Sequence, residues 1–341
     1  MSRFQHWMHL ARPFSLAATF VPITITFCLV LGSFGREPFF KFIGNYFLAL
    51  VSCGCLQISC NMLNSWGDYR SGLDTPDNPS NQSEIVFGIL SPNRVLTVAL
   101  LFNFTGAAVG LLLLWRCFSV ELLALAVIGI FGSLNYSTGI KFKYRGVGVP
   151  FVFFLMGVFL MMAADLVFGG LLHSLFVSNQ PNRVNAVIGV TLICLSTSGM
   201  VANIMHANDM RDIEKDAGAG IKTTASLLGP RRAATLFTVL HLLPHIAAVT
   251  ITICFAVTAM SAPRITNLFV ALLLLLPLLT LPRTIKLVRA AWENLGVLPH
   301  LESWSGLLPQ TAKLFLQTGL LYCVTWIALF LMFYNVQHTL P

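Results

Sequence analysis

Side chains able to bind a metal ion through oxygen gather in two short segments of this sequence. Eight of the 13 Asp and Glu residues fall within residues 68–84 and 209–216. The first segment begins N-S-W-G-D-Y-R-S-G-L-D at residue 64, and the second reads N-D-M-R-D-I-E-K-D from residue 208. Each contains an Asn followed four residues later by an Asp. Acidic residues that served only solubility would be more dispersed, so these segments are candidates for chemistry.

The spacing within each segment suits a divalent cation. Residues four apart on a helix share a face, with Cβ atoms roughly 6 Å apart, which pairs Asn64 with Asp68 and Asp212 with Asp216. Mg²⁺ prefers oxygen ligands, usually takes one or two carboxylates, and completes its shell with water and phosphate. Two such clusters predict a magnesium–diphosphate clamp, whose cations would be Lys141, Lys143, Arg145, Arg211 and Lys222.

The alternative is that both segments are solvated, acid-rich loops of a transporter. Polarity alone does not separate the two hypotheses. A transporter is expected to carry ionisable residues near the middle of the membrane, whereas almost all of them here flank the apolar stretches. The repeated spacing at helix ends therefore favours the clamp.

The composition predicts that membrane-spanning helices position these segments. Of the 341 residues, 56% are hydrophobic and 10% charged, and the mean hydropathy is +0.78; soluble domains are about 25% charged. A bilayer core of about 30 Å needs about 20 apolar residues, and lipid admits only helices or closed barrels. We expect one all-α membrane domain over residues 1–341, with nine helices near 15–35, 41–65, 95–115, 120–138, 147–168, 184–207, 233–259, 265–282 and 314–335.

The basic residues predict the orientation. With a cytoplasmic N-terminus, 16 of the 21 Lys and Arg residues lie on the cytoplasmic side, which favours N-in and C-out. Both acidic segments would then face the cytoplasm from a multi-pass protein of the inner (cytoplasmic) membrane. The net charge of +8 is better explained by loops facing anionic lipid than by nucleic-acid binding.

An internal repeat is a further prediction. Asn64 and Asp68 match Asn208 and Asp212 at an offset of 144 residues. Four predicted helices separate the two motif regions, 61–77 and 203–223, so both copies keep the same orientation in the membrane. This pattern indicates a weak parallel repeat.

Four motifs in order give the chain a family resemblance. They are A-R-P-F-S-L at 11–16, the segment at 64–75, Tyr136 with K-Y-R-G-V-G at 143–148, and the segment at 208–216, which is followed by K-T at 222–223 and L-L-G at 227–229. The sequence resembles the UbiA superfamily of intramembrane prenyltransferases. Within it, the closest branch is that of the 1,4-dihydroxy-2-naphthoate polyprenyltransferases of menaquinone synthesis.

The resemblance implies a fold and a reaction. Nine helices would surround a central cavity open to lipid, and Mg²⁺ would assist transfer of a polyprenyl group from polyprenyl diphosphate to an aromatic acceptor. In the named branch the acceptor is dihydroxynaphthoate, which loses CO₂. Tyr136 and Tyr144 would shelter the allylic cation.

Roles follow from matching the motifs residue by residue. Catalysis would involve Asp68, Asp212, Asp216 and Lys143. The diphosphate would be bound by Asn64, Lys141, Arg145, Asn208, Arg211, Lys222 and Tyr136. Mg²⁺ would be held by Asn64, Asp68, Asp74, Asp212 and Asp216.

Two departures keep other functions open. Ser65 stands where the family usually has an Asp, and Val149 stands where an acidic residue often follows the G-x-G stretch. The acceptor could be another aromatic compound or a tetrapyrrole, or the chain could be a non-catalytic homologue or transporter. A pseudoenzyme is expected to lose the second acidic segment, yet Asp212 and Asp216 are present.

The remaining motifs indicate packing. His241 and His245 have the spacing of metal ligands, but no acidic third ligand is near, and we interpret both as packing residues. His206 could be a supporting or a purely structural residue. Gly106 and Gly110 indicate close helix contact. Residues 283–312 are interpreted as a long, partly amphipathic loop that lies on the membrane surface or caps the cavity.

Overall fold

Helices make up nearly all the regular structure of this protein. The computed structural model describes residues 2–31, 39–72, 74–77, 79, 83–170, 183–218, 220–259 and 265–339. Its longer helices are α1 (Arg3–Ala11), α2 (Ala17–Val30), α3 (Phe39–Arg70), α4 (Pro92–Arg116), α5 (Val120–Asn135), α7 (Leu160–Phe168), α9 (Arg183–Arg211), α12 (Pro230–Ala259), α13 (Ile265–Leu274), α14 (Leu281–Glu293) and α16 (Leu307–Thr339). Short helices join them: η1 (Pro13–Leu16), η3 (Phe142–Tyr144), α6 (Gly148–Val152), η4 (Phe153–Phe159), α10 (Ile213–Gly218), α11 (Thr224–Leu228), η5 (Leu276–Thr280) and α15 (His300–Ser303).

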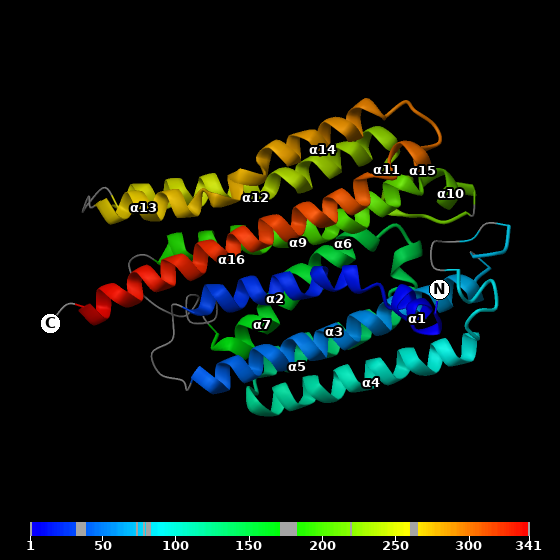
Figure 1. Cartoon of the computed structure of the whole chain (residues 1–341), viewed down its shortest axis with the longest axis horizontal. Coiled ribbons are helices and arrows are strands. Elements are labelled where there is room, and N and C mark those ends of the chain that lie inside the picture. The colour runs from blue at the N-terminus through cyan, green and yellow to red at the C-terminus, as the bar shows by residue number, and fades with distance from the viewer. Residues whose placement is uncertain are drawn as a thin grey trace.

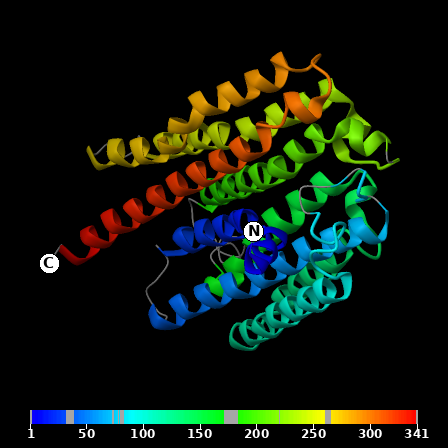
Figure 2. The same cartoon turned by 45° about the vertical axis from the view of Figure 1, so that its right-hand side comes forward.

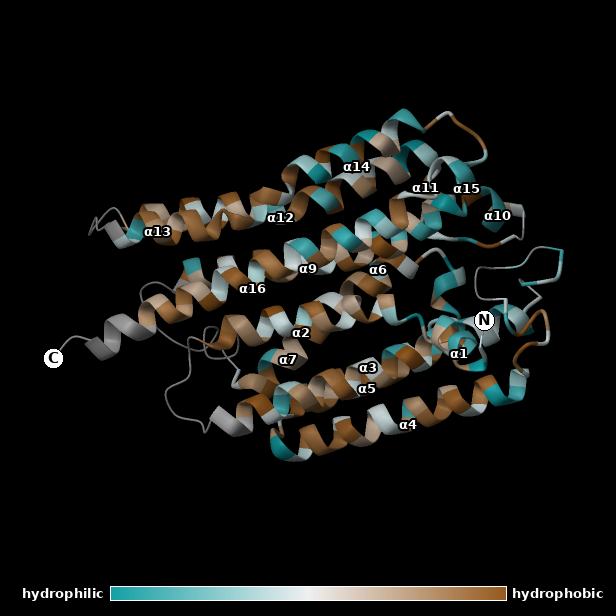
Figure 3. Cartoon of the chain, viewed as in Figure 1, coloured by the Kyte–Doolittle hydropathy of each residue, from teal (hydrophilic) through white to brown (hydrophobic). Residues whose placement is uncertain are grey.

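The membrane class is confirmed by helix length and composition. Within the described ranges, eight helical stretches are long and apolar enough to cross a bilayer. The predicted fourth helix forms as α5, which is apolar but shorter. Figure 3 shows apolar residues along the long helices and hydrophilic residues around α10 and α15. The chain is a multi-pass, all-helical protein, while the count of nine crossings and the orientation stay predictions.

One predicted loop is largely helical. The interpretation of residues 283–312 as a loop is wrong, because α14 continues from η5 to Glu293, α15 covers 300–303, and α16 begins at Leu307. Pro277 and Pro282 each lie in the first turn of a helical piece. Proline there needs no N–H partner, so the chain changes direction at η5 and stays helical.

Both acidic segments lie at the same end of the bundle. In Figures 1 and 2 α3 and α9 run in the same direction and finish near α1, α10 and α11. The N-terminus is at this end and the C-terminus at the opposite one (Figure 1). We call it the motif end.

Small residues let the helices approach closely. A Cβ atom on Gly157 in η4 would lie 2.1 Å from Ser198 Oγ on α9, so only glycine fits there. Gly106 on α4 meets α3 in the same way, and Ser52 Oγ donates a 2.8 Å hydrogen bond to its carbonyl oxygen. The interpretation of the Gly106–Gly110 motif as a packing contact is therefore confirmed.

Candidate active site

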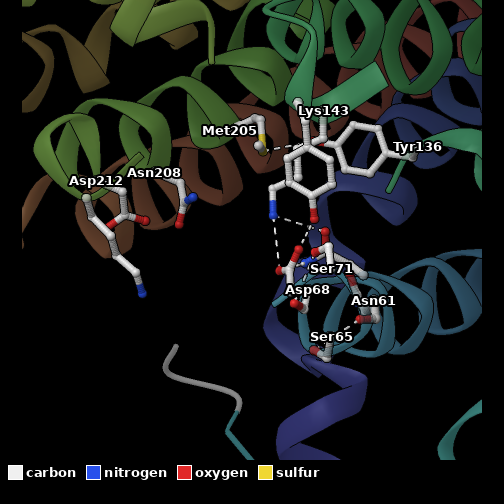
Figure 4. Close-up of polar contacts among 12 residues, drawn as sticks. Asn61, Ser65, Asp68, Ser71, Tyr136, Lys143, Met205, Asn208 and Asp212 are labelled. Atoms are coloured by element: carbon white, nitrogen blue, oxygen red, sulfur yellow. Dashed lines mark hydrogen bonds and ion pairs between the residues drawn. The ribbon is translucent and has the colours of Figure 1, made fainter. Parts of the chain in front are cut away.

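The first acidic segment begins in the last turns of α3, where Asn64 and Asp68 are buried. Asn64 Nδ2 donates to Asp68 Oδ2 at 3.3 Å, as expected of residues four apart on a helix. Lys143 Nζ lies 3.1 Å from Asn64 Oδ1 and 3.3 Å from Asp68 Oδ2, and the Tyr144 hydroxyl donates to the other Asp68 oxygen (Figure 4). The Lys143 ammonium therefore interacts with two of the three predicted metal ligands of this segment, Asn64 and Asp68.

The tight turn at residues 141–145 orients the Lys143 side chain toward the acidic residues. Lys141 adopts a left-handed conformation with φ of 59°, and the short helix η3 follows it directly. The backbone N–H of Lys143 donates to the Tyr136 carbonyl oxygen at 2.9 Å. As a result Lys143 points inward, whereas Lys141 and Arg145 on either side of it are exposed.

The second acidic segment lies where α9 ends and α10 begins. Arg211 donates to the Asp212 carboxylate at 2.8 and 2.6 Å and to Asn208 Oδ1 at 3.0 Å. The helix is interrupted at Asp212, yet the backbone N–H of Asp216 still donates to the Asp212 carbonyl oxygen at 2.8 Å. Arg211 therefore pairs with a carboxylate of the second segment, as Lys143 does with Asp68 in the first.

Asp209 is a site residue that the sequence-based assignment left out. Its side chain is buried, accepts a hydrogen bond from the Thr224 backbone, and interacts electrostatically with Lys143, Asp212 and Asp216. The available signal was its position directly after Asn208, where the resembled family pattern has a second Asn. This buried carboxyl group is an ionisable side chain of the site that the spacing argument had not counted.

Lys143 connects the two segments. Besides its contacts to Asn64 and Asp68, it interacts electrostatically with Asp209 and Asp216. Burial and the charge of Asp212 raise the pKa of Asp216 to about 6, which the positive charge of Lys143 partly offsets. Such a shift is the result expected when carboxylates crowd together.

The carboxylates are paired with cations in this arrangement. Across the described ranges, no group of three or more His, Cys, Asp or Glu residues is close enough to hold a metal ion. Asp68 is paired with Lys143 and Asp212 with Arg211, while the backbone N–H of Asp74 donates to the Asp68 carbonyl oxygen at 3.3 Å. A divalent cation would have to replace these ion pairs.

Arg12 is a second residue that the assignment left out. Its side chain is half-buried, donates to Ser65 Oγ at 3.2 Å, and interacts electrostatically with Asp68 and Asp74. Within the part of the chain described, its buried Nε has no hydrogen-bond partner. Arg12 belongs to the A-R-P motif at 11–13 that supported the family resemblance, but the sequence analysis assigned it no function.

Four predicted site residues form no hydrogen bond or ion pair with an acidic side chain among the described residues. Lys141, Arg145 and Lys222 are exposed and form no ion pair among the described residues, although Arg145 and Lys222 pair through their backbones. The Tyr136 hydroxyl donates to Met205 Sδ at 3.2 Å, and its ring stacks on Phe151 at 5.8 Å. None of these four residues takes part in the Lys143–Asp68 or Arg211–Asp212 ion pair.

His206, His241 and His245 make packing contacts between helices. His245 Nε2 lies 2.8 Å from Thr284 Oγ1, whereas His241 contacts Asn203, so the two rings have different partners. His206 Nε2 lies 2.9 Å from the Ala233 carbonyl oxygen. The packing interpretation of His241 and His245 is confirmed, and the contact of His206 with α12 supports a structural role for it.

Comparison with known proteins identifies the chain. The model of the UbiA prenyltransferase family matches residues 20–295. The chain belongs to the UbiA prenyltransferase family. The UbiA resemblance found in the motifs is confirmed, and membership makes the chain a prenyltransferase.

Curated UbiA relatives align over most of this chain. UbiA prenyltransferase domain-containing protein 1 of Gallus gallus is 28% identical over 91% of this chain and 81% of its own length. The 1,4-dihydroxy-2-naphthoate octaprenyltransferase of Bacillus subtilis (strain 168) is 31% identical over 67% of both chains.

Solved UbiA structures share the fold. A UbiA homolog from Archaeoglobus fulgidus bound to GPP and Mg²⁺ gives a TM-score of 0.56 at 20% identity, over 95% of this chain and 99% of that one. A digeranylgeranylglyceryl phosphate synthase structure gives 0.55 at 16% identity, over 96% and 100%. At these identities the likeness establishes the arrangement of helices alone.

The two departures from the UbiA pattern have distinct surroundings. Ser65 Oγ accepts a hydrogen bond from the Arg12 guanidinium, so a neutral hydroxyl stands beside this cation where the family usually has a carboxylate. Val149 is buried and packs beside Ala202 and Leu240. An acidic residue at 149 would require a polar pocket that this chain has replaced with core packing.

Proposed function

We propose that this UbiA protein transfers a polyprenyl group from polyprenyl diphosphate to an aromatic acceptor at the motif end. The observation that carries the proposal is the position of Lys143, in contact with Asn64 and Asp68 and within electrostatic range of Asp209 and Asp216. Two acidic segments far apart in the sequence thus share one small region. A diphosphate bound through divalent cations needs this combination of acids and bases.

The residues present fit Mg²⁺ as a cofactor. Asn64, Asp68, Asp74, Asp212 and Asp216 offer hard oxygen atoms, and a buried Arg12 Nε without a partner among the described residues is a further donor for an anion. Bound there, Mg²⁺ would supply positive charge that stabilises the departing diphosphate. The A. fulgidus homolog solved with GPP and Mg²⁺ supports this assignment.

The chain's own cations would bind the phosphate oxygens. Lys143 and Arg211 are each within hydrogen-bond distance of a carboxylate, and they would donate instead to phosphate when the carboxylates turn to the metal. Charge-assisted bonds of this type are strong and directional. Lys141, Arg145 and Lys222 are exposed at the same end and would attract the anionic headgroup over a longer range.

We propose 1,4-dihydroxy-2-naphthoate as the acceptor. The support is the B. subtilis octaprenyltransferase, 31% identical over two thirds of this chain, together with the motif resemblance. The ring carbon that bears the carboxylate would bond to the first prenyl carbon as the C–O bond to diphosphate breaks. The carboxylate would then leave as CO₂ and return its electron pair to the ring, so no base is needed to remove a ring proton.

The proposed site faces the cytoplasm from the inner membrane. The support is the excess of Lys and Arg residues at the motif end. In that position the polar headgroup would meet the acidic segments while the polyprenyl tail stays in the bilayer.

The test is turnover by purified protein in lipid nanodiscs. It would be supplied with Mg²⁺, a polyprenyl diphosphate and a panel of aromatic acids, and products would be read by mass spectrometry. We expect a prenylated product of dihydroxynaphthoate with the mass of CO₂ lost, and at least a 100-fold loss of rate in Asp212→Ala. The exposed Glu302→Ala is the charge-matched control.

Other outcomes select among the remaining hypotheses. If only another aromatic acid or a tetrapyrrole is prenylated, the proposed acceptor is wrong, but the proposed magnesium–diphosphate clamp still stands. Full turnover in excess chelator, or in Asp212→Ala, would overturn the clamp. Absence of any product with a folded protein would favour the non-catalytic homologue or transporter.

A further inference from the structure

The short helix α10 carries the second acidic segment into the site. It spans only Ile213–Gly218, and a helix of six residues is too short to hold its own orientation in water. Asp216 lies on it and Asp212 immediately precedes it. The direction of both carboxylates therefore depends on what α10 is attached to.

One side of α10 is attached to His300. The His300 side chain is 2% exposed, and its Nδ1 is paired with the Glu214 carboxylate on α10. Its Nε2 lies 3.3 Å from the Leu295 carbonyl oxygen. Because both nitrogens face acceptor oxygens, His300 is positioned to donate to each, and it links α10 to the chain that follows α14.

The histidine itself is held rigidly. Its ring packs on the ring of Trp304, with centroids 4.0 Å apart, and Trp304 is fully buried. The indole Nε1 donates to the Ala291 carbonyl oxygen on α14 at 3.2 Å. The same apolar cluster includes Met210 and Ile213, which flank Asp212 in the sequence. His300 therefore packs on the same buried cluster that holds the second acidic segment in place.

The other side of α10 is attached to the first acidic segment. Lys215 Nζ donates to the Pro79 carbonyl oxygen at 3.3 Å, which lies five residues beyond Asp74. Ile213 is buried, Glu214 meets His300, and Lys215 reaches the loop after α3. These three successive contacts fix the rotation of α10 about its own axis. In that orientation the Asp216 side chain interacts electrostatically with Lys143 and Asp212.

We propose that His300 is a positioning residue for the prenyl transfer, acting through Glu214 to hold Asp212 and Asp216 in the geometry that binds the divalent cation and diphosphate. This inference rests on the proposed function of the site. His300 touches neither segment's metal-binding oxygens, so its removal would weaken cation and donor binding much more than the chemical step.

Three variants separate the hydrogen bond from packing. Glu214→Ala removes the partner of His300 from a partly exposed position and leaves the Trp304 contact in place. His300→Asn retains a hydrogen-bond donor near the Nδ1 position, whereas His300→Gln retains one near the Nε2 position. We expect His300→Asn to keep near-normal binding, and His300→Gln and Glu214→Ala to weaken it similarly. Glu302→Ala, on the same short helix α15 and exposed, is the matched control.

The readouts are Mn²⁺ affinity without substrate, measured by electron paramagnetic resonance, and kcat and KM for the polyprenyl diphosphate. Glu214→Ala and His300→Gln should raise both the Mn²⁺ dissociation constant and KM by about 5- to 10-fold, with kcat within about 2-fold. His300→Asn and Glu302→Ala should stay within about 2-fold throughout. Thermal unfolding midpoints close to wild type in Glu214→Ala would exclude a general loss of folding.

Failure of this inference is distinguishable from failure of the proposed function. If wild-type protein turns over and binds Mn²⁺, but Glu214→Ala matches it in KM and Mn²⁺ affinity, the positioning role is overturned. An equal fall of kcat and stability in every variant, His300→Asn included, would also overturn it. If wild-type protein binds no Mn²⁺, the clamp itself fails.

Discussion

Lys143 is the residue on which the site is organised. It is the single cation of the 141–145 turn whose side chain reaches a carboxylate among the described residues. Sequence reasoning selected it together with Lys141 and Arg145, and could not rank the three. The ranking comes from the left-handed Lys141 and the bond from Lys143 N–H to Tyr136, which are features of the folded turn.

Removal of this ammonium should weaken the reaction strongly. Hydrogen bonds to charged groups are worth about 1.5–3 kcal/mol, so Lys143→Gln should lower kcat/KM by about 10- to 150-fold. The exposed Arg94→Ala at the start of α4 should stay within about 2-fold. Steady-state kinetics with varied polyprenyl diphosphate measures this, and equal values for the two variants would contradict the role of Lys143.

Protonation of Asp216 should limit cation binding in mild acid. Its pKa is raised to about 6, first by burial and then by Asp212. Above that pH the carboxylate is charged and available to a cation; as the pH falls through about 6, protons compete and Mn²⁺ affinity should drop. In Asp216→Asn this dependence should vanish and the affinity should be low throughout. A pH profile identical in both proteins would refute the assignment.

Asp209 and Arg12 show where residue-level prediction ends. Asp209 is buried and Arg12 is half-buried. Both interact with the predicted ligands, yet neither has the four-residue spacing that drew attention to the others. Their proximity to the site arises from the packing of α1 and α9 against other elements, which no local pattern encodes.

At the scale of elements, the sequence predicted what helical periodicity and length determine. The apolar stretches form α3 and α9. The Asn64–Asp68 pair lies in the last turns of α3, whereas α9 ends at Arg211, between Asn208 and Asp212. The continuation of helix from 282 to Glu293 was not predicted, because the basic residues Arg283, Lys286 and Arg289 led us to assign this stretch to a cytoplasmic loop. The internal repeat stays a prediction, which the equivalent placement of the two pairs supports.

Close packing of η4 on α9 should be essential for stability. A methyl group on Gly157 would meet Ser198 side-chain and backbone atoms at 2.1–2.5 Å. Overpacking of this kind costs about 1–3 kcal/mol, so Gly157→Ala should clearly lower the thermal unfolding midpoint in detergent. Gly129→Ala on α5, with no atom within 4 Å of the added carbon, should be neutral or slightly stabilising. Equal midpoints would show that η4 and α9 adjust freely.

At the scale of the whole molecule, the two termini lie at opposite ends and both acidic segments at one end (Figure 1), while the topology in the membrane stays a prediction. The membrane side is set by charge alone. An impermeant maleimide should label Val120→Cys from outside intact spheroplasts and label Asn93→Cys only after lysis. Both positions are exposed, and the eight native cysteines are buried or half-buried. The reverse labelling pattern would invert the orientation.

The most direct test of the account is to locate the cation itself. Anomalous diffraction from crystals grown with Mn²⁺ and an unreactive prenyl thiodiphosphate would give its position independently of any kinetic argument. We predict Mn²⁺ between the α3 and α9–α10 segments, bound by Asp68 on one side and Asp212 or Asp216 on the other, with the thiodiphosphate bridging them. Anomalous density confined to one segment, or away from both, would contradict the central claim.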